Sequence, residues 1–176
     1  MIVISGTISR GSTPLSGWWI GPASKTVKGQ LAVPEPTAVA MLETQRMLFS
    51  PAKDYPGFAD FLWADSIPKL LQARLIESFE NYDMAHAPLR NADIGQADYQ
   101  LLVDVRRFRI EVDSEPTAEV GLSARILDKS GKVIASRLFE GSQKFDKVEP
   151  QPAVDAFNDA FGRIAKDMIA WSAQAL

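Results

Sequence analysis

The sequence predicts a single domain of the α/β (α+β mixed) class, with a mixed, largely antiparallel sheet of about five strands and two main helices. Two runs of alternating apolar and polar residues, at 99–112 and 117–127, are typical of strands with one buried face, and a third strand is expected at 132–142. Two other runs, near 67–82 and 152–171, carry apolar residues at the spacing of an amphipathic helix. The length of 176 residues suits one such domain with a tail.

The first helix is expected to follow Asp65 or Ser66, either of which can cap it. Pro68 falls in its first turn, where the missing N–H costs nothing. Asn81 and Asp83 are expected to end it. Trp63 directly precedes this helix and is expected to pack beneath its start. One helical face collects the apolar side chains and their neighbours: Ile67, Leu70, Leu71, Leu75, Ser78, Phe79 and Tyr82.

The first of the three strands changes its apolar phase halfway along. Up to Val105 every second residue from Tyr99 is apolar, but the pattern resumes at Phe108 and continues through Ile110. Because the side-chain period of a strand is two, this change requires one extra residue. The sequence therefore predicts a β-bulge at Arg106-Arg107.

The second and third strands are expected to complete an antiparallel meander. The second spans 117–127 and the third 132–142. The loop of residues 128–131 between them is a hairpin loop in which Gly131 can adopt positive φ. The last helix is expected from about Pro152, and its apolar stripe is closed by Trp171, which we expect in the core.

The N-terminal part is harder to interpret. Residues 1–30 are rich in Gly, Pro, Ser and Thr and are expected to be a loop-like leader, with the domain spanning 31–176. Short strands are conceivable at 2–5 and 18–20. The first five residues fit either the end of a signal-peptide apolar region or a disordered leader. Further strands are predicted at 40–49 and 58–63.

Composition excludes several kinds of function. The net charge of −3 does not favour nucleic acid as a partner. The absence of cysteine rules out a disulfide framework, a thiolate nucleophile and a cysteine-based zinc site. The longest apolar runs are a few residues, far short of the roughly 20 that a spanning helix needs.

No catalytic, cofactor-binding or metal-binding motif is predicted. Residues 6–13 have the glycine spacing of a phosphate-binding loop, but Ser12 stands where the lysine belongs, and Pro14 and Gly17 oppose the helix that should follow. His86 is the single histidine, and no nucleophile-elbow motif accompanies it, so we interpret it as a surface or strand-edge residue. The sequence therefore predicts a protein that is not an enzyme.

Three other features have structural and functional interpretations. Asp98 and Asp104 would lie about 20 Å apart along a regular strand, too far to act as an acid–base pair. The arginines at 106, 107 and 109 are interpreted as a solvated strand face rather than an anion site. We expect Asp104, Glu111 and Asp113 to balance their charge. The leader contains Trp18 and Trp19, which are candidates for partner contact, although docking onto the domain itself is an equal alternative.

Taken together, several segments resemble the family of ABC-type transport auxiliary lipoproteins. The resemblance covers roughly 31–176 and rests on the order of the segments more than on any one of them. The segments are 31–36 (LAVPEP), 42–47 (LETQRM), 63–72 (WADSIPKLLQ), 97–101 (ADYQL), 104–110 (DVRRFRI), 118–128 (AEVGLSARILD), 133–139 (VIASRLF), 153–158 (AVDAFN) and 169–171 (IAW).

This resemblance implies a fold similar to the N-terminal domain of the periplasmic Tol translocation protein, without catalytic residues or cofactors. It also implies a periplasmic lipoprotein, anchored in the outer membrane in its native form. Such a protein works with the permease, the ATPase and the MCE-type substrate-binding subunit of an ABC system that moves phospholipids or other apolar molecules. A lipoprotein needs an anchoring cysteine, which is absent here; the segment that follows Arg10 resembles the one that usually follows it.

Two functions from different classes therefore stay open. The first is that of a non-enzymatic accessory subunit of an MCE-type system, which docks through a sheet edge or the leader around Trp18 and Trp19. The alternative is a free-standing periplasmic protein that binds lipid or another small ligand in an enclosed pocket. Either protein could form a homo-oligomer, and an enzyme is the third and least favoured option.

Overall fold

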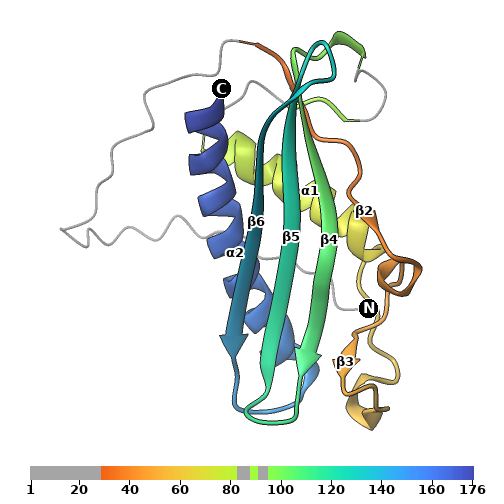
Figure 1. Cartoon of the computed structure of the whole chain (residues 1–176). Helices are drawn as coiled ribbons and strands as arrows, with labels where there is room; N and C mark the ends of the chain where they lie inside the picture. The colour runs from red at the N-terminus through yellow and green to blue at the C-terminus, as the bar shows by residue number, and fades with distance from the viewer. Residues whose placement is uncertain (1–28, 83–87, 91–94) are drawn as a thin grey trace, which may run out of the picture.

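The computed structural model describes residues 29–82, 88–90 and 95–176 (Figure 1). In this part of the chain, a mixed sheet forms one layer and two long helices cover one of its faces. The predicted fold class is therefore confirmed. The sheet has six described strands, one more than expected: β1 (Leu31–Ala32), β2 (Thr37–Ala38), β3 (Phe49–Ser50), β4 (Tyr99–Glu111), β5 (Thr117–Asp128) and β6 (Val133–Lys144).

The three long strands form the predicted antiparallel meander, in the order β4-β5-β6. The predicted bulge is present, because Val105 pairs with Leu122 and Arg107 pairs with the next residue, Gly121, which leaves Arg106 without a partner. A Cβ at Gly121 would lie 3.2 Å from the Cβ of Arg107, so a glycine leaves space for the crowded bulge. Apolar side chains therefore face the helices on both sides of the bulge, as the phase change required.

The hairpin between β5 and β6 is held by one carboxylate. Asp128 accepts hydrogen bonds from the amide and hydroxyl of Ser130 and from the amide of Lys132. The hydroxyl of Ser130 is the main cause of a lowered pKa of Asp128. Gly131 has a φ of +82°, the conformation that the sequence required of it.

The predicted strands at 40–49 and 58–63 are wrong. The first region contains the 3₁₀ turn η1 (Ala40–Leu42) and only the two-residue strand β3, while the second begins in the 3₁₀ turn η2 (Pro56–Phe58). Leu42 and Met47 would point to opposite faces of a strand, yet both are buried because the irregular backbone turns each of them inward. The backbone instead bonds within the segment, from Trp63 N–H to the Gln45 oxygen.

The first helix, α1 (Ile67–Asn81), forms where the periodicity predicted it. The side chain of Ser66 makes no capping hydrogen bond; instead the Asp65 carboxylate accepts the amide hydrogen of Ser66. Trp63 packs next to the start of α1 and is 2% exposed. Its ring also contacts Phe108 of β4 and Phe157 of the last helix, both at 5.7 Å, so three parts of the chain meet in one aromatic cluster.

The last helix, α2 (Pro150–Ala175), begins two residues before the predicted Pro152. It packs against β5 and β6. Trp171 was expected in the core but is only half-buried, because it lies at the end of the stripe and meets Phe139 edge-on at 5.5 Å. Within the described ranges, neither helix is long and apolar enough to cross a membrane.

Candidate functional site

A groove of about 1050 Å³ lies between the irregular segment 39–59 and the bulged part of β4. Two pieces of chain about 60 residues apart form it, because β2 and β3 run parallel to β4 and hold the segment against its edge. The groove is lined by Val39, Met41, Leu42, Arg46, Met47, Leu48, Phe49, Ser50, Ala52, Lys53, Asp54, Tyr55, Pro56, Phe58, Ala59, Arg106, Arg107, Phe108 and Arg109.

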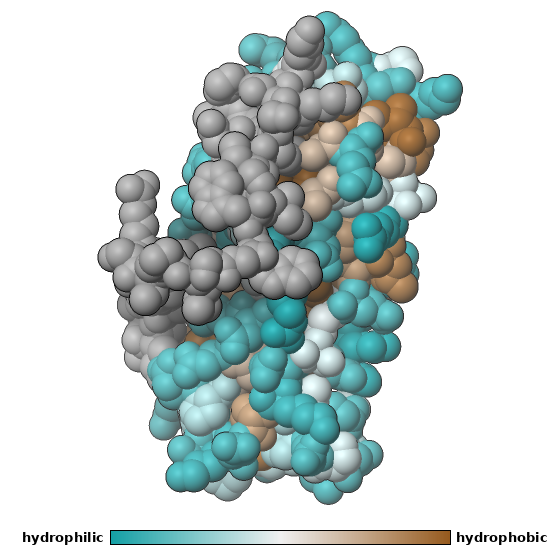
Figure 2. All heavy atoms as spheres, turned by 90° about the vertical axis from the view of Figure 1, so that its left-hand side faces the viewer, coloured by the Kyte–Doolittle hydropathy of each residue, from teal (hydrophilic) through white to brown (hydrophobic). Residues whose placement is uncertain are grey.

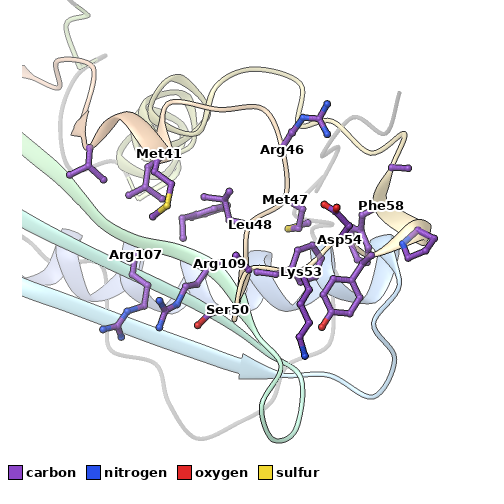
Figure 3. Close-up of a pocket in the computed structure, with 18 of the residues that line it drawn as sticks. Met41, Arg46, Met47, Leu48, Ser50, Lys53, Asp54, Phe58, Arg107 and Arg109 are labelled. Atoms are coloured by element: carbon purple, nitrogen blue, oxygen red, sulfur yellow. The ribbon is translucent and has the colours of Figure 1, made fainter.

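The bulge concentrates positive charge at this groove. In a regular strand Arg106 and Arg107 would point to opposite faces of the sheet, whereas here both side chains are exposed. Arg107 and Arg109 lie on the face of the sheet opposite the helices. Figure 3 shows the side chains of Arg107 and Arg109 directed to the same side of the view as Lys53. Arg46 is directed to the other side. The three residues Arg107, Arg109 and Lys53 are called the cationic rim below.

Carboxylates on neighbouring strands partly balance this rim. Arg109 Nε lies 3.1 Å from the Glu119 carboxylate, which Arg107 approaches at 3.7 Å. Arg107 also lies 3.7 Å from Glu140. Arg106 pairs with Asp104 at 2.7 Å, and Arg109 lies 3.6 Å from Glu111.

The predicted balancing by Asp104 and Glu111 is therefore confirmed. Asp113 forms no ion pair among the described residues, because Glu119 and Glu140 on β5 and β6 lie closer to the arginines. Those two carboxylates were not predicted, although the strand pairing that places Glu119 opposite Arg109 follows from the meander.

The opposite wall of the groove is apolar, and it runs from exposed side chains to the half-buried Leu48 and the buried Phe58. Met41 is 71% exposed and Val39 62%, and Figure 3 shows Met41 and Leu48 on the same wall. Below them, Phe49 stacks on Tyr55 with ring centroids 4.3 Å apart and meets Phe58 edge-on at 5.0 Å. Met41, Leu48 and Phe58 are called the apolar wall below. Sequence reasoning missed it because residues 40–49 were interpreted as a regular strand.

One carboxylate links the end of β4 to β3. The hydroxyl of Ser50 donates to Glu111, and this bond is the main cause of a lowered pKa of Glu111. The amides of Val112 and Asp113 also donate to the same carboxylate, at 3.2 and 3.3 Å. The charge of Glu111 thus holds β3 in place beside the groove.

A second surface lies at the other side of the sheet, along β6. In the described part of the chain, β6 pairs with β5 alone, so its outer edge has no strand neighbour over twelve residues, although Arg163 of α2 donates to the Ser142 oxygen at 2.7 Å. Three large apolar side chains on β6 are exposed, namely Val133, Ile134 and Leu138, the last of them to 56%. Figure 2 looks toward this side of the molecule and shows apolar surface gathered in its upper half.

The other residues singled out in the sequence do not form a site. Trp18, Trp19, His86 and the near-motif 6–13 lie outside the described residues. Asp98 and Asp104 have separate structural partners: the first accepts the amide hydrogen of Gln30, and the second accepts the hydroxyl of Thr37. In the ranges that the structure describes, no group of three or more histidine, cysteine or acidic residues could hold a metal ion.

The class of protein that this arrangement defines is a two-layer α/β domain with one free sheet edge and one amphipathic groove. A family model described as the ABC-type transport auxiliary lipoprotein component matches residues 21–169. The chain therefore belongs to this family, and the resemblance found in the sequence is confirmed. Lipoproteins are attached to membranes through their lipid, so the family is one of membrane-anchored proteins.

Individual proteins are also similar to the chain. The chain is similar to the uncharacterized protein bll6063 of Bradyrhizobium diazoefficiens, with 70% identity over 157 residues, 89% of this chain and 43% of that protein. The chain thus spans less than half the length of this relative. It is also similar to the crystal structure of XCC0632 from Xanthomonas campestris, of the DUF330 family, with a TM-score of 0.76 and 26% identity over 88% of this chain and 90% of the other.

A further crystal structure, of an uncharacterized protein, has a TM-score of 0.60 at 15% identity and covers 80% of this chain and 90% of its own. At this identity the likeness concerns the fold alone.

Proposed function

We propose that the chain acts as a non-enzymatic accessory subunit of an MCE-type ABC transport system that moves phospholipids or other apolar molecules between the inner and outer membranes. The observation that carries the proposal is the family match over residues 21–169. In this proposal the native protein is a periplasmic lipoprotein anchored in the outer membrane. Its partners are the MCE-type substrate-binding subunit and the permease and ATPase of the system.

The free edge of β6 supports a docking role. An unpaired strand presents a row of N–H and C=O groups, and soluble proteins usually shorten, cover or charge such edges. β6 carries three charged residues, Arg137, Glu140 and Lys144, but it is twelve residues long and also exposes Val133, Ile134 and Leu138. A strand or loop of the MCE subunit that pairs with this edge would satisfy the backbone groups and cover the apolar side chains.

Co-purification of the chain with the MCE subunit tests this proposal. We expect the two to associate in detergent and in membranes, and Leu138→Gln on β6 to weaken the association about tenfold, which is the effect of losing roughly 1.4 kcal/mol at an interface. Met41→Gln, at another exposed apolar position beside the groove, is the control and should leave association unchanged. Absence of association under both conditions would contradict the proposal.

The alternative, a free-standing carrier, requires a pocket that encloses most of its ligand. Between the sheet and the helices, the described residues instead form a filled core in which Trp63, Phe108 and Phe157 are in ring contact. Association distinguishes the two functions, since a free-standing carrier should enclose and retain lipid in native mass spectrometry and should not co-purify with the MCE subunit in detergent or in membranes. An enzymatic role would be supported only by hydrolase turnover that disappears on changing His86.

A further inference from the structure

We propose that the groove between segment 39–59 and β4 is a binding site for an amphiphile with an anionic headgroup and an alkyl chain. The cationic rim of Arg107, Arg109 and Lys53 would receive the headgroup, and the apolar wall of Met41, Leu48 and Phe58 would hold the chain. A role of this site in transport rests on the proposed function, that of an accessory subunit. Its existence is testable on the purified chain alone.

The charges of the groove favour an anion. Five cationic side chains and the Asp54 carboxylate line it, but Arg46 is directed to the other side, and Arg106 and Arg109 are paired with Asp104 and Glu119 at 2.7 and 3.1 Å, so Arg107 and Lys53 are the cations that an anion would engage first. Arg107 meets its two carboxylate partners only at 3.7 Å, beyond the usual hydrogen-bond range of roughly 2.7–3.2 Å. Lys53 forms no ion pair with any described residue. N–H donors of both side chains are therefore available to a phosphate or carboxylate oxygen, and such charge-assisted hydrogen bonds are stronger than neutral ones.

The wall opposite the rim favours an alkyl chain. Met41 and Val39 are among the most exposed large apolar side chains of the described structure, at 71% and 62%. Covering such side chains removes apolar surface from water, which is favourable for the ligand and the protein alike. Methionine adapts its shape to an irregular partner, and the groove is lined by two, Met41 and Met47. An alkyl chain is the partner that needs such adaptability.

The backbone around the groove argues against a peptide as occupant. An extended peptide would add to a strand edge through its main chain. β2 pairs with this edge of β4 up to Val105, and β3 pairs with it from Ile110, where Ile110 N–H donates to the Leu48 oxygen at 2.8 Å. At most the four residues 106–109 are left for an added strand, which would form few main-chain bonds, so side chains supply most of the binding groups of the groove. The volume of about 1050 Å³ lies just above the roughly 300–1,000 Å³ typical of small-molecule sites, enough for one headgroup and one chain.

Isothermal titration of the purified chain with dodecyl phosphate, below its critical micelle concentration, tests the site. Dodecyl maltoside supplies the same chain without the charge, and inorganic phosphate supplies the charge without the chain. We expect saturable binding of dodecyl phosphate, and binding at least tenfold weaker for each of the other two. Comparable binding of dodecyl maltoside, or of inorganic phosphate, would overturn the proposal, as would no binding of dodecyl phosphate.

Two matched pairs of variants locate the site. Met41→Gln should weaken dodecyl phosphate binding about tenfold, and Leu138→Gln, exposed on β6, should not. Arg107→Gln should also weaken it about tenfold, whereas Arg125→Gln, on the same face of the sheet but outside the groove, should not. All four positions are solvent-exposed, and circular dichroism checks that each variant is folded. Equal losses within either pair would overturn the site.

The same variants separate this inference from the accessory role. Leu138→Gln is expected to affect docking to the MCE subunit and not ligand binding, and Met41→Gln the reverse. If dodecyl phosphate does not bind but the MCE subunit does, the inference fails and the proposed function stands. If the ligand binds and the MCE subunit does not, the proposed function fails and the site stands.

Discussion

The two edges of β4 have very different neighbours. On one edge, β5 pairs with it along twelve positions, and the only irregularity is the bulge. On the other, three two-residue strands pair with it in parallel, with irregular chain between them. The first edge builds the rigid layer that carries α2, and the second forms a groove. A single strand can thus serve as scaffold on one side and as the wall of a candidate site on the other.

The largest effect on stability is expected from removing the aromatic contact that joins the scaffold side of β4 to the groove side. Phe157 of α2 stacks on Phe108 of β4 at 4.4 Å and meets Trp63, which follows the groove segment, at 5.7 Å. Phe157→Ala should lower the free energy of unfolding by about 3–5 kcal/mol, since it leaves a cavity in the core. Urea denaturation measures this loss. Met41→Ala, at the exposed end of the apolar wall, should change the free energy of unfolding by less than about 0.5 kcal/mol.

A smaller effect is expected on the scaffold side alone. A Cβ on Gly141 of β6 would lie 2.9 Å from the Ala160 oxygen of α2, so Gly141→Ala should cost about 1–3 kcal/mol through overpacking. The same substitution at Gly162, an exposed position of α2 with nothing within 4 Å, should instead stabilise by roughly 0.5–1 kcal/mol. Thermal melts of the two variants should move in opposite directions; a shift in the same direction would show that α2 does not approach β6 this closely.

On the groove side, one buried side chain holds β1 against α1. Gln72 is 8% exposed and its Nε2 donates to the Val33 oxygen at 3.0 Å. Gln72→Leu should cost about 1–2 kcal/mol, because that oxygen loses its partner in the interior. Hydrogen exchange at residues 29–38 should accelerate more than exchange in β5. The matched Gln151→Leu, at an exposed position of α2, should leave both regions unchanged.

The smallest expected effect is a pH dependence of stability, to which one carboxylate on the groove side and one on the scaffold side contribute. Glu111, beside β3, and Asp128, in the β5–β6 hairpin, have pKa values lowered mainly by the hydroxyls of Ser50 and Ser130. A carboxyl whose pKa is lower in the folded chain contributes stability above its unfolded value and loses it as pH falls through the folded value. Melting temperatures should therefore drop below about pH 4.5, the ordinary value for glutamate.

Variants assign this dependence to each edge. Glu111→Gln should reduce the acid-induced drop by the share of the β3 edge, and Asp128→Asn by the share of the hairpin. Glu149→Gln, at the start of α2 and away from both edges, is the control. An unchanged acid profile in both Glu111→Gln and Asp128→Asn would contradict the roles given to these hydrogen bonds.

The same comparison explains what the sequence could predict. The scaffold was predictable, because a period of two indicates β4 and β5, the hairpin loop at 128–131 places β6 after them, a helical period indicates α1 and α2, and the phase change at Arg106-Arg107 indicates the bulge. The groove was not. The alternation of apolar residues over 40–49 does not correspond to a strand, and no local sequence pattern predicts that β3 lies beside β4. Parallel pairing of segments about 60 residues apart depends on the whole fold.

The candidate site was predictable only in its cations. The cluster Arg106, Arg107 and Arg109 is visible in the sequence, and its interpretation as a balanced, solvated face is confirmed for the ion pairs. Part of that face becomes one side of a groove because the segment around Met41 lies opposite it. The interpretation of residues 40–49 as a strand did not predict this arrangement. Trp18 and Trp19 stay a prediction, since they lie outside the described residues.

The bulge has a consequence for how this protein can change over generations. Arg106 has no partner across the ladder to β5, and without it the alternation from Val105 through Arg107 to Phe108 would be that of a regular strand. Position 106 can therefore vary in charge and size with little effect on the pairing that holds the sheet together. Variation at that one position would tune which molecules the surface attracts while the fold that carries it stays the same.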